Sequence, residues 1–246
     1  MIRIFDIILL IVVYLIVLVI IAIAEFLRKR FKLGTTFTRR MIHLFAGDTI
    51  LLLPFFSHWI YPFLIPVGLA LLVGLAFAKA KESFLTKTMV EETDVILHAY
   101  GPVYYIVAIG VMVPLFWGLN GTLRYITMAA TMIMAWGDGL SSYIPRILRS
   151  RGYRLHEIIS KRTIEGSCSM FIGAFAGAII ALLIASHFGA TPMTFSATQI
   201  LLLALVSSII ATIAELLSVG PLRHFDNFTV PFSSAVCLYL LGRLLL

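Results

Sequence analysis

The sequence predicts an all-α, polytopic integral membrane helix bundle with about eight transmembrane helices. Of the 246 residues, 61% are hydrophobic and only 13% are charged, whereas soluble domains carry far more charge. The mean hydropathy is +1.03. The apolar residues form long continuous runs instead of the alternating pattern of a membrane β-barrel. Because the longest polar connection has about 20 residues, residues 1–246 are expected to form a single transmembrane domain.

Eight apolar runs are long enough to be interpreted as membrane spans. They cover residues 4–27, 41–57, 60–78, 95–117, 125–147, 167–187, 198–219 and 229–246. The second run is short, and Gly101-Pro102 interrupts the fourth, so a broken or re-entrant helix is the alternative at either place. Seven spans is therefore the alternative count.

The distribution of basic residues predicts the orientation. Sixteen of the 19 Lys and Arg residues lie in the alternate connections 28–40, 79–94, 146–166 and 220–228. Because cytoplasmic loops carry an excess of Lys and Arg, these connections are expected to face the cytoplasm, with both termini outside if all eight runs cross. The same bias explains the formal net charge of +7 without a nucleic-acid partner. Cys168 and Cys237 lie in apolar runs and are interpreted as small buried hydrophobic residues.

The start of the second run combines basic residues with an imidazole. Arg39, His43 and Gly47 are spaced four apart and therefore share one helical face. Arg39 and Arg40 at a membrane boundary, with His43 one turn deeper, suit a phosphate or a lipid headgroup. The alternative is that the arginines anchor the helix at the membrane boundary and that His43 is structural. Asp48 within the apolar run argues for a functional site, because ionisable groups at that depth are rare without a function.

The fifth run contains Asp138 between Gly137 and Gly139. A carboxylate inside an apolar helix costs roughly 2.5–3.5 kcal/mol on insertion scales and is usually functional. The glycines are expected to loosen or break the helix and to expose N–H groups to phosphate oxygens. Asp138 is a hard oxygen ligand for Mg²⁺, Ser142 lies on the same side of the helix, and Pro145 is expected to end the run. A structural polar pocket between helices is the alternative.

The sixth run is preceded by a second basic segment. Lys161 and Arg162 can neutralise a triphosphate. Gly166 and Ser167, at the start of the helix, are expected to offer free N–H groups to an anion. Glu165 is either a second metal ligand or an ordinary carboxylate at a helix start. Further along the sixth run, small residues at spacing four, Ser169, Gly173 and Gly177, predict a close approach to another helix.

The last connection places two more polar residues at the same membrane face. Asp226 and Asn227 stand just before the eighth run. Both can join the same site, Asp226 as a metal ligand and Asn227 as a nucleotide-binding group. An Asx turn that caps the eighth helix is the alternative.

Four motifs now stand in order along the chain. They are Arg40-x-x-His43-x-x-x-Gly47, Gly137-Asp138-Gly139, Lys161-x-x-x-Glu165-Gly166-Ser167 and Asp226-Asn227-x-Thr229-Val230-Pro231. This set resembles the polyprenol kinase family, which includes dolichol kinase, phytol kinase and the CTP-dependent diacylglycerol kinase and is related to the CDP-diacylglycerol synthases. The resemblance covers most of the chain from residue 39 onward. The arginine-rich stretch 146–154 stands where family members often have a compact Gly-rich loop.

The resemblance implies transfer of the terminal phosphoryl group of CTP, or a related nucleotide, to a lipid alcohol that enters from the bilayer. Mg²⁺ on Asp138 and the cations of Lys161 and Arg162 are expected to offset the charge of the transferring group. The base that accepts the alcohol proton is either His43 or Asp138. The alternatives are a CTP-dependent diacylglycerol kinase, a cytidylyltransferase that makes a CDP-lipid, and, from another class, a membrane transporter.

Overall fold

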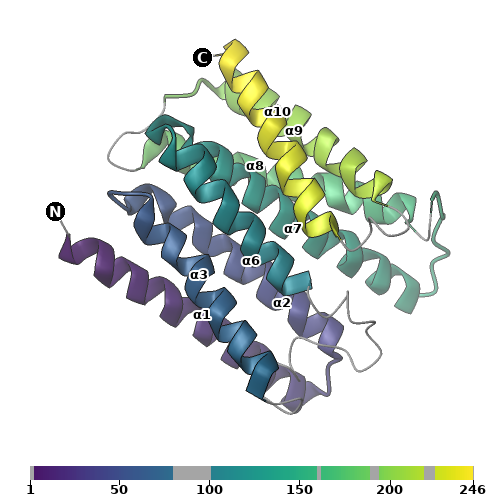
Figure 1. The fold of residues 1–246 in the computed structure, drawn as a ribbon. Coiled ribbons are helices and arrows are strands. Elements are labelled where there is room, and N and C mark those ends of the chain that lie inside the picture. The colour runs from purple at the N-terminus through teal and green to yellow at the C-terminus, as the bar shows by residue number, and fades with distance from the viewer. Residues whose placement is uncertain (1–2, 80–100, 160–161, 189–193, 219–224, 246) are drawn as a thin grey trace.

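The chain folds into a bundle of helices in the computed structural model (Figure 1). The structure describes residues 3–79, 101–159, 162–188, 194–218 and 225–245. Among these residues there are eight α-helices and no named strand. The helices are α1 (Ile4–Phe31), α2 (Thr35–Gly47), α3 (Ile60–Lys79), α6 (Gly101–Met112), α7 (Arg124–Ser150), α8 (Ile164–His187), α9 (Ala197–Leu217) and α10 (Asp226–Leu245). Each predicted apolar run contains one of them, so the all-α class is confirmed for the described residues.

Two of the predicted spans change their winding along their length. The second run is α2 followed by a 3₁₀-helix, Asp48–Phe55, which agrees with the alternative of an interrupted helix. In the fourth run, α6 is followed by a π-helix, Val113–Gly118. Residues 95–100 lie outside the described part of the chain.

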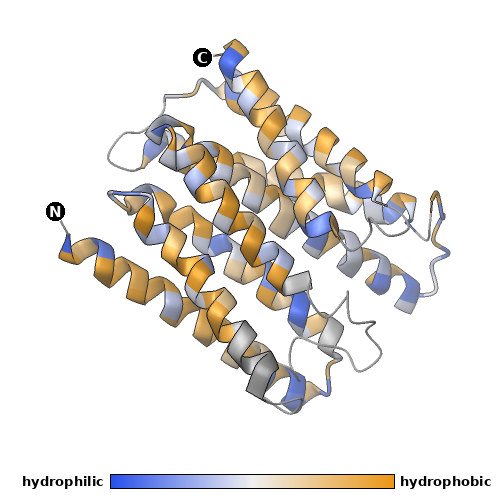
Figure 2. Ribbon diagram, in the orientation of Figure 1, coloured by the Kyte–Doolittle hydropathy of each residue, from blue (hydrophilic) through white to orange (hydrophobic). Residues whose placement is uncertain are grey.

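Among the described residues, four helices, α1, α8, α9 and α10, are long and apolar enough to cross a membrane. Figure 2 shows hydrophobic residues along the lengths of the helices and hydrophilic residues mostly toward their ends. On α1, large apolar side chains such as Ile11, Leu15 and Val19 are more than half exposed. Such a surface is unfavourable in water and suits lipid tails. These observations support a membrane protein.

Helix α7 is the centre of the bundle. Residues 124–135 are buried on every side of the helix, which is the pattern of a helix surrounded by others. Helix α7 contacts α8 most extensively, and also α2 and α10. It continues through Pro145 to Ser150, so the prediction that Pro145 ends the fifth run is wrong.

Helices α7 and α8 approach so closely that no side chain separates their backbones at two glycines. A Cβ atom added at Gly177 would lie 2.7 Å from the carbonyl oxygen of Met132, and one at Gly173 would collide with the carbonyl oxygen of Trp136. Ser169, one turn before Gly173, is buried. The close approach predicted from Ser169, Gly173 and Gly177 is therefore confirmed.

We expect Gly177→Ala to destabilise the protein by about 1–3 kcal/mol, because the new methyl group meets backbone rather than a movable side chain. Thermal unfolding of the detergent-purified protein measures this loss. Gly110→Ala is the matched control, since a Cβ at Gly110 would lie 3.5 Å from Pro66, an ordinary contact distance. Equal unfolding temperatures for the two variants would contradict the assigned packing.

Candidate functional site

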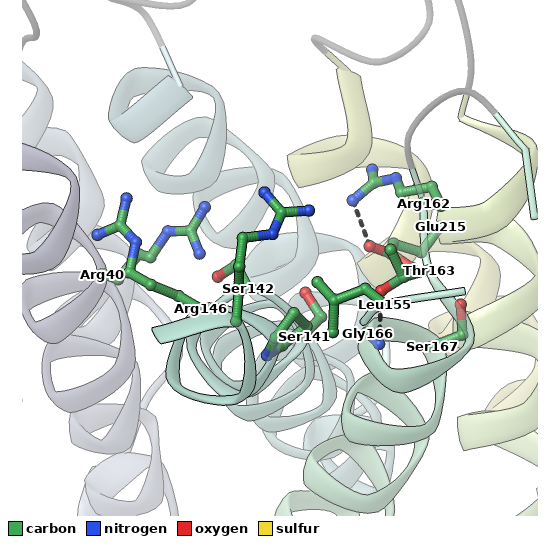
Figure 3. Close-up of a pocket in the computed structure, with 12 residues that line it drawn as sticks. Arg40, Ser141, Ser142, Arg146, Leu155, Arg162, Thr163, Gly166, Ser167 and Glu215 are labelled. Carbon is green, nitrogen blue, oxygen red and sulfur yellow. Dashed lines mark hydrogen bonds and ion pairs between the residues drawn. The ribbon is translucent and has the colours of Figure 1, made fainter. Parts of the chain in front are cut away.

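A polar cavity of about 370 Å³ lies at the end of α7 that carries Ser150. This volume is in the range of small-molecule sites. Figure 3 shows Arg40 and Arg146 on one side of the cavity, Arg162 with Glu215 on the other, and Ser141 and Leu155 between them. The cavity therefore joins residues from α2, α7, α9 and the segment that enters α8.

The cavity is strongly basic. Its lining includes four arginines, Arg40, Arg146, Arg149 and Arg162, and one acid, Glu215. Arg162 is the arginine that the acid neutralises: its Nη1 atom donates to Glu215 Oε1, and its Nη2 atom lies 3.5 Å from Asp226 Oδ2. Within the described part of the chain, neither Arg146 nor Arg149 has a carboxylate partner. This excess of guanidinium groups is suited to a polyphosphate.

The N-terminus of α8 is capped by the protein itself. The Thr163 hydroxyl accepts from the Gly166 N–H at 3.1 Å. The N–H groups of Ile164 and Ser167 donate to the carbonyl oxygens of His156 and Thr163, both at 2.9 Å. The prediction that Gly166 and Ser167 offer free backbone N–H groups is therefore wrong.

What Gly166 and Ser167 contribute is different. A Cβ at Gly166 would lie 3.1 Å from the carbonyl oxygen of Ser141, so the glycine lets the start of α8 pack against α7. The Ser167 hydroxyl is buried beside the cavity and has no hydrogen-bond partner among the described residues. The Ser167 side chain, rather than its backbone, is thus available to a ligand.

The glycines on either side of Asp138 also have a packing function. Helix α7 is unbroken through Gly137 and Gly139, so their N–H groups belong to the hydrogen-bond ladder of the helix. A Cβ at Gly137 would lie 2.6 Å from Met170 Sδ of α8, and one at Gly139 would lie 3.3 Å from Leu44 Cδ1 of α2. The expected helix break and free N–H groups are wrong. The glycines instead allow α8 and α2 to pack on opposite sides of Asp138.

Asp138 itself lies where the cavity meets the bundle. The hydroxyls of Ser141 and Ser142 both donate to its backbone carbonyl oxygen at 3.0 Å, and both serines line the cavity. Among the described residues, no hydrogen bond or ion pair engages the Asp138 carboxylate, although it lies near enough to Asp226 and Glu215 to repel them electrostatically. As far as the described part of the chain shows, the Asp138 carboxylate is therefore available to a ligand.

The three predicted metal ligands do not assemble into one set. The Glu165 carboxylate lies 2.7 Å from His156 Nδ1 and accepts from the His156 N–H at 3.1 Å, while Asp226 is paired with Arg162. In the part of the chain that the structure describes, no group of three or more His, Cys, Asp or Glu residues could hold a metal ion. Glu165 is placed as an ordinary carboxylate at a helix start.

A second group of polar residues lies deeper, between α2, α6 and α7. The rings of His43 and Tyr105 are 4.0 Å apart between centroids, and Trp136 Nε1 donates to Asp48 Oδ1 at 2.7 Å. His43 is close enough to Asp138 to interact with it electrostatically. The structure thus brings His43 and Asp138, the two candidate bases, into one neighbourhood.

The structure places three of the remaining predicted residues near the site. Arg40 lines the cavity, and Arg39 interacts electrostatically with His43 and Asp226. Asn227 is buried beside Asp226 at the start of α10. Lys161 lies outside the described residues.

Sequence reasoning missed Glu215, Tyr105, Arg146 and Arg149 as site residues. Glu215 carried a usable signal, because it is an acid in an apolar run, but only the fold shows that it faces Arg162. Arg146 and Arg149 were obscured because Pro145 was expected to end the helix before them. Tyr105 carried no signal in the sequence, since tyrosine is common in membrane helices.

One known protein resembles the chain over most of its length. A phytol kinase from Synechocystis sp. is 26% identical over 214 residues, which are 87% of this chain and 82% of that protein. This similarity supports a relationship to the polyprenol and phytol kinase family. No family model matches the chain, and no solved structure matches it.

The pairing of Arg162 with Glu215 generates a stability prediction. We expect Glu215→Ala to destabilise the protein by about 3 kcal/mol, because it removes the acceptor of a mostly buried guanidinium. The double variant Arg162→Met, Glu215→Met is expected to recover part of this loss, because it removes both charges of the pair, although Asp226 then loses its contact with Arg162. Thermal unfolding in detergent measures both effects. Glu165→Ala, at the exposed His156 pair, is the control and should change stability little. A loss of stability in the double variant equal to the sum of the losses in the two single variants would contradict the pairing.

Proposed function

We propose that this chain is a membrane lipid-alcohol kinase that transfers the terminal phosphoryl group of CTP, or another nucleoside triphosphate, to a polyprenol or other isoprenoid alcohol. The observation that carries the proposal is the arginine-lined cavity, whose Ser141 and Ser142 bond to the backbone of Asp138, a residue whose carboxylate has no partner among the described residues. The similarity to a phytol kinase supports the acceptor class. The resemblance of the four motifs to the polyprenol kinase family supports CTP as the donor.

In this proposal the cavity holds the phosphates. Arg40 and Arg146 lie on one side of the cavity (Figure 3), and Arg149 also lines it. Guanidinium groups form charge-assisted, often bidentate hydrogen bonds with phosphate oxygens. The Ser167 hydroxyl, which has no partner among the described residues, supplies a further donor. Arg162 is held in place by Glu215 and Asp226, and Lys161, its neighbour in the sequence, adds a second positive charge. Because phosphoryl transfer depends mainly on positioning and charge stabilisation, such a site is chemically sufficient.

Mg²⁺ fits this site as an ion that arrives with the nucleotide. It usually takes one or two carboxylates and completes its shell with substrate phosphates and water. Asp138 and Asp226, which lie close enough to repel each other, are the carboxylates that would hold it. When bound, the ion would neutralise charge on the phosphates. Glu165, which is engaged by His156, is not part of this set.

The reaction places few demands on the protein. The alcohol oxygen forms a bond to the terminal phosphorus while the bond from that phosphorus to the bridging oxygen breaks, giving a lipid phosphate and a nucleoside diphosphate. The proton of the alcohol needs an acceptor. His43 Nε2 is buried and has no hydrogen-bond partner among the described residues, and it lies near Asp138. We assign the proton to His43, with Asp138 engaged by the nucleotide and its metal ion.

The proposed membrane arrangement follows from the basic residues. Arg40, Arg146 and Arg149 gather at one end of the bundle, and the sequence places most of the Lys and Arg residues in the same alternate set of connections. By the positive-inside bias this end faces the cytoplasm, where nucleotides are available. About eight helices cross the bilayer, and the alcohol enters laterally with its tail among the helices.

The direct test of the function is a transfer assay. Purified protein is incubated with terminally labelled CTP, ATP, GTP or UTP and with phytol, geranylgeraniol, a dolichol or diacylglycerol. We expect label in an isoprenoid alcohol, with CTP the best donor, because the motif set and the similarity both indicate this class. Label in diacylglycerol alone would select the diacylglycerol kinase alternative, and a CDP-lipid with release of pyrophosphate would select the cytidylyltransferase. No labelled lipid with any nucleotide would refute the kinase proposal.

The control for this assay is Asp138→Asn, which keeps the size of the side chain but removes its charge. It should abolish transfer while the protein remains folded, as judged by its unfolding temperature and by gel filtration. Glu157→Gln is the matched neutralisation of an exposed acid in the connection between α7 and α8, and it should retain full activity. If the Asp138→Asn variant transferred phosphate at the wild-type rate, the proposed role of this carboxylate would be wrong.

The arginines of the cavity give a second kinetic prediction. We expect Arg146→Ala and Arg149→Ala each to raise KM for the nucleotide by about 10-fold, the value of one charge-assisted hydrogen bond, with little change in KM for the alcohol. Steady-state kinetics with each substrate varied in turn measure the difference. Arg151→Ala and Arg154→Ala are matched controls, because both side chains are exposed and neither lines the cavity. Equal effects from all four variants would indicate a diffuse charge effect rather than direct contact.

A further inference from the structure

Two buried polar atoms on facing helices lack hydrogen-bond partners. They are His43 Nε2 of α2 and Tyr105 Oη of α6, and within the described part of the chain neither is satisfied. Tyr105 is only 7% exposed, and its ring is packed against the His43 ring, with centroids 4.0 Å apart and the planes inclined by 35°. A buried donor or acceptor without a partner is destabilising, and native structures contain few of them. Two on neighbouring rings indicate that a ligand supplies the missing partner.

The position of the Tyr105 hydroxyl is fixed by its surroundings. A Cβ atom added at Gly47 would lie 2.5 Å from Tyr105 Oη and 2.6 Å from the Cβ of Ala135. The hydroxyl therefore lies in the space left by the missing side chain of Gly47, where α2 and α7 meet. The hydrogen bond from Trp136 to Asp48 joins α7 to the 3₁₀-helix that follows α2, one residue further along each segment.

This pair lies next to the carboxylate that we assign to the nucleotide. Asp138 is close enough to interact electrostatically with both His43 and Tyr105. Arg40, which lines the cavity, precedes His43 by about one helical turn on α2. The polar groups thus continue from the arginine cavity into the apolar bundle, past Asp138, to His43 and Tyr105.

We propose that Tyr105, with His43, forms the binding site for the acceptor hydroxyl of a lipid alcohol. This inference rests on the proposed kinase function and deepens it by naming where the acceptor binds. The Tyr105 O–H donates a hydrogen bond to the alcohol oxygen, and the alcohol O–H donates to His43 Nε2. As the alcohol oxygen bonds to the terminal phosphorus, its proton moves to Nε2 and the bond to the leaving diphosphate breaks. The apolar helices around the site accommodate the lipid tail.

The test is Tyr105→Phe, which keeps the ring against His43 and removes only the hydroxyl. Binding of radiolabelled phytol to the detergent-purified protein is measured without nucleotide, and steady-state kinetics follow with phytol and with CTP varied. We expect the affinity for phytol to fall, and KM for phytol to rise, by about 10-fold, the value of one hydrogen bond. KM for CTP should not change. Phytane, the corresponding hydrocarbon without the hydroxyl, should bind the wild type and the Tyr105 variant equally well. It should bind the wild type more weakly than phytol does.

Tyr125→Phe is the matched control. Tyr125 is also a buried tyrosine, but its hydroxyl already donates to the carbonyl oxygen of Leu238, at 3.4 Å, near the opposite end of α7. Removing that hydroxyl should leave phytol binding unchanged. Equal phytol affinity in the wild type and the Tyr105 variant, or an equal loss in both tyrosine variants, would overturn the inference.

The two measurements separate the inference from the proposed function. If the wild type binds phytol through the Tyr105 hydroxyl but labels no lipid from any nucleotide, the acceptor site stands and the kinase function fails. If the wild type phosphorylates phytol and Tyr105→Phe does so with unchanged KM, the function stands and the acceptor site is wrong. A wild type that neither binds nor phosphorylates any alcohol in the panel would overturn both.

Discussion

The direct contact between the backbones of α7 and α8 is the constraint on which the rest of the structure depends. At Gly173 and Gly177 the second helix lies against carbonyl oxygens of the first, so their separation cannot adjust through side-chain motion. The same line of contact continues to Gly166, which packs against Ser141 at the mouth of the cavity. The distance between the walls of the cavity is therefore set by packing along the whole interface, and the polar site is held by apolar contacts far from it.

Charge imposes the second constraint, because an unpaired charge is expensive in an apolar bundle. Arg162 and Glu215 satisfy each other across the cavity wall, and Asp226 supports the same guanidinium from α10. This pairing joins three segments that are distant in the sequence. Arg146 and Arg149, which have no carboxylate partner in the described part of the chain, remain for the proposed phosphate contacts.

The periodic, apolar character of the sequence was enough to predict the helices, but the functions of individual glycines and prolines depend on neighbours that the sequence does not show. Gly137 and Gly139 have the same signature whether they break a helix or admit another helix, and only the positions of Met170 and Leu44 decide between the two. Pro145 lies within α7, so the proline does not end the helix, although it removes one backbone hydrogen bond. Glu215 was visible as an unusual acid, yet its partner Arg162 lies 53 positions away in the chain. The sequence was thus enough to predict which residue types form the candidate site and where along the chain they lie. It was not enough to predict which of them contact one another.

Under the proposed function, the two substrates differ so strongly in polarity that they require different environments within a short distance. Phosphates need the arginines at the ends of the helices, whereas the alcohol must keep its tail among apolar side chains. Asp138 lies between these environments, and the glycines on both sides of it let α2 and α8 approach α7 at that level. A bulkier residue at Gly137 would displace the side chain of Met170 on α8, and one at Gly139 would press on Leu44 of α2. The glycines flanking Asp138 therefore serve the chemistry through packing: they keep the lipid-facing and the phosphate-facing walls within reach of one carboxylate.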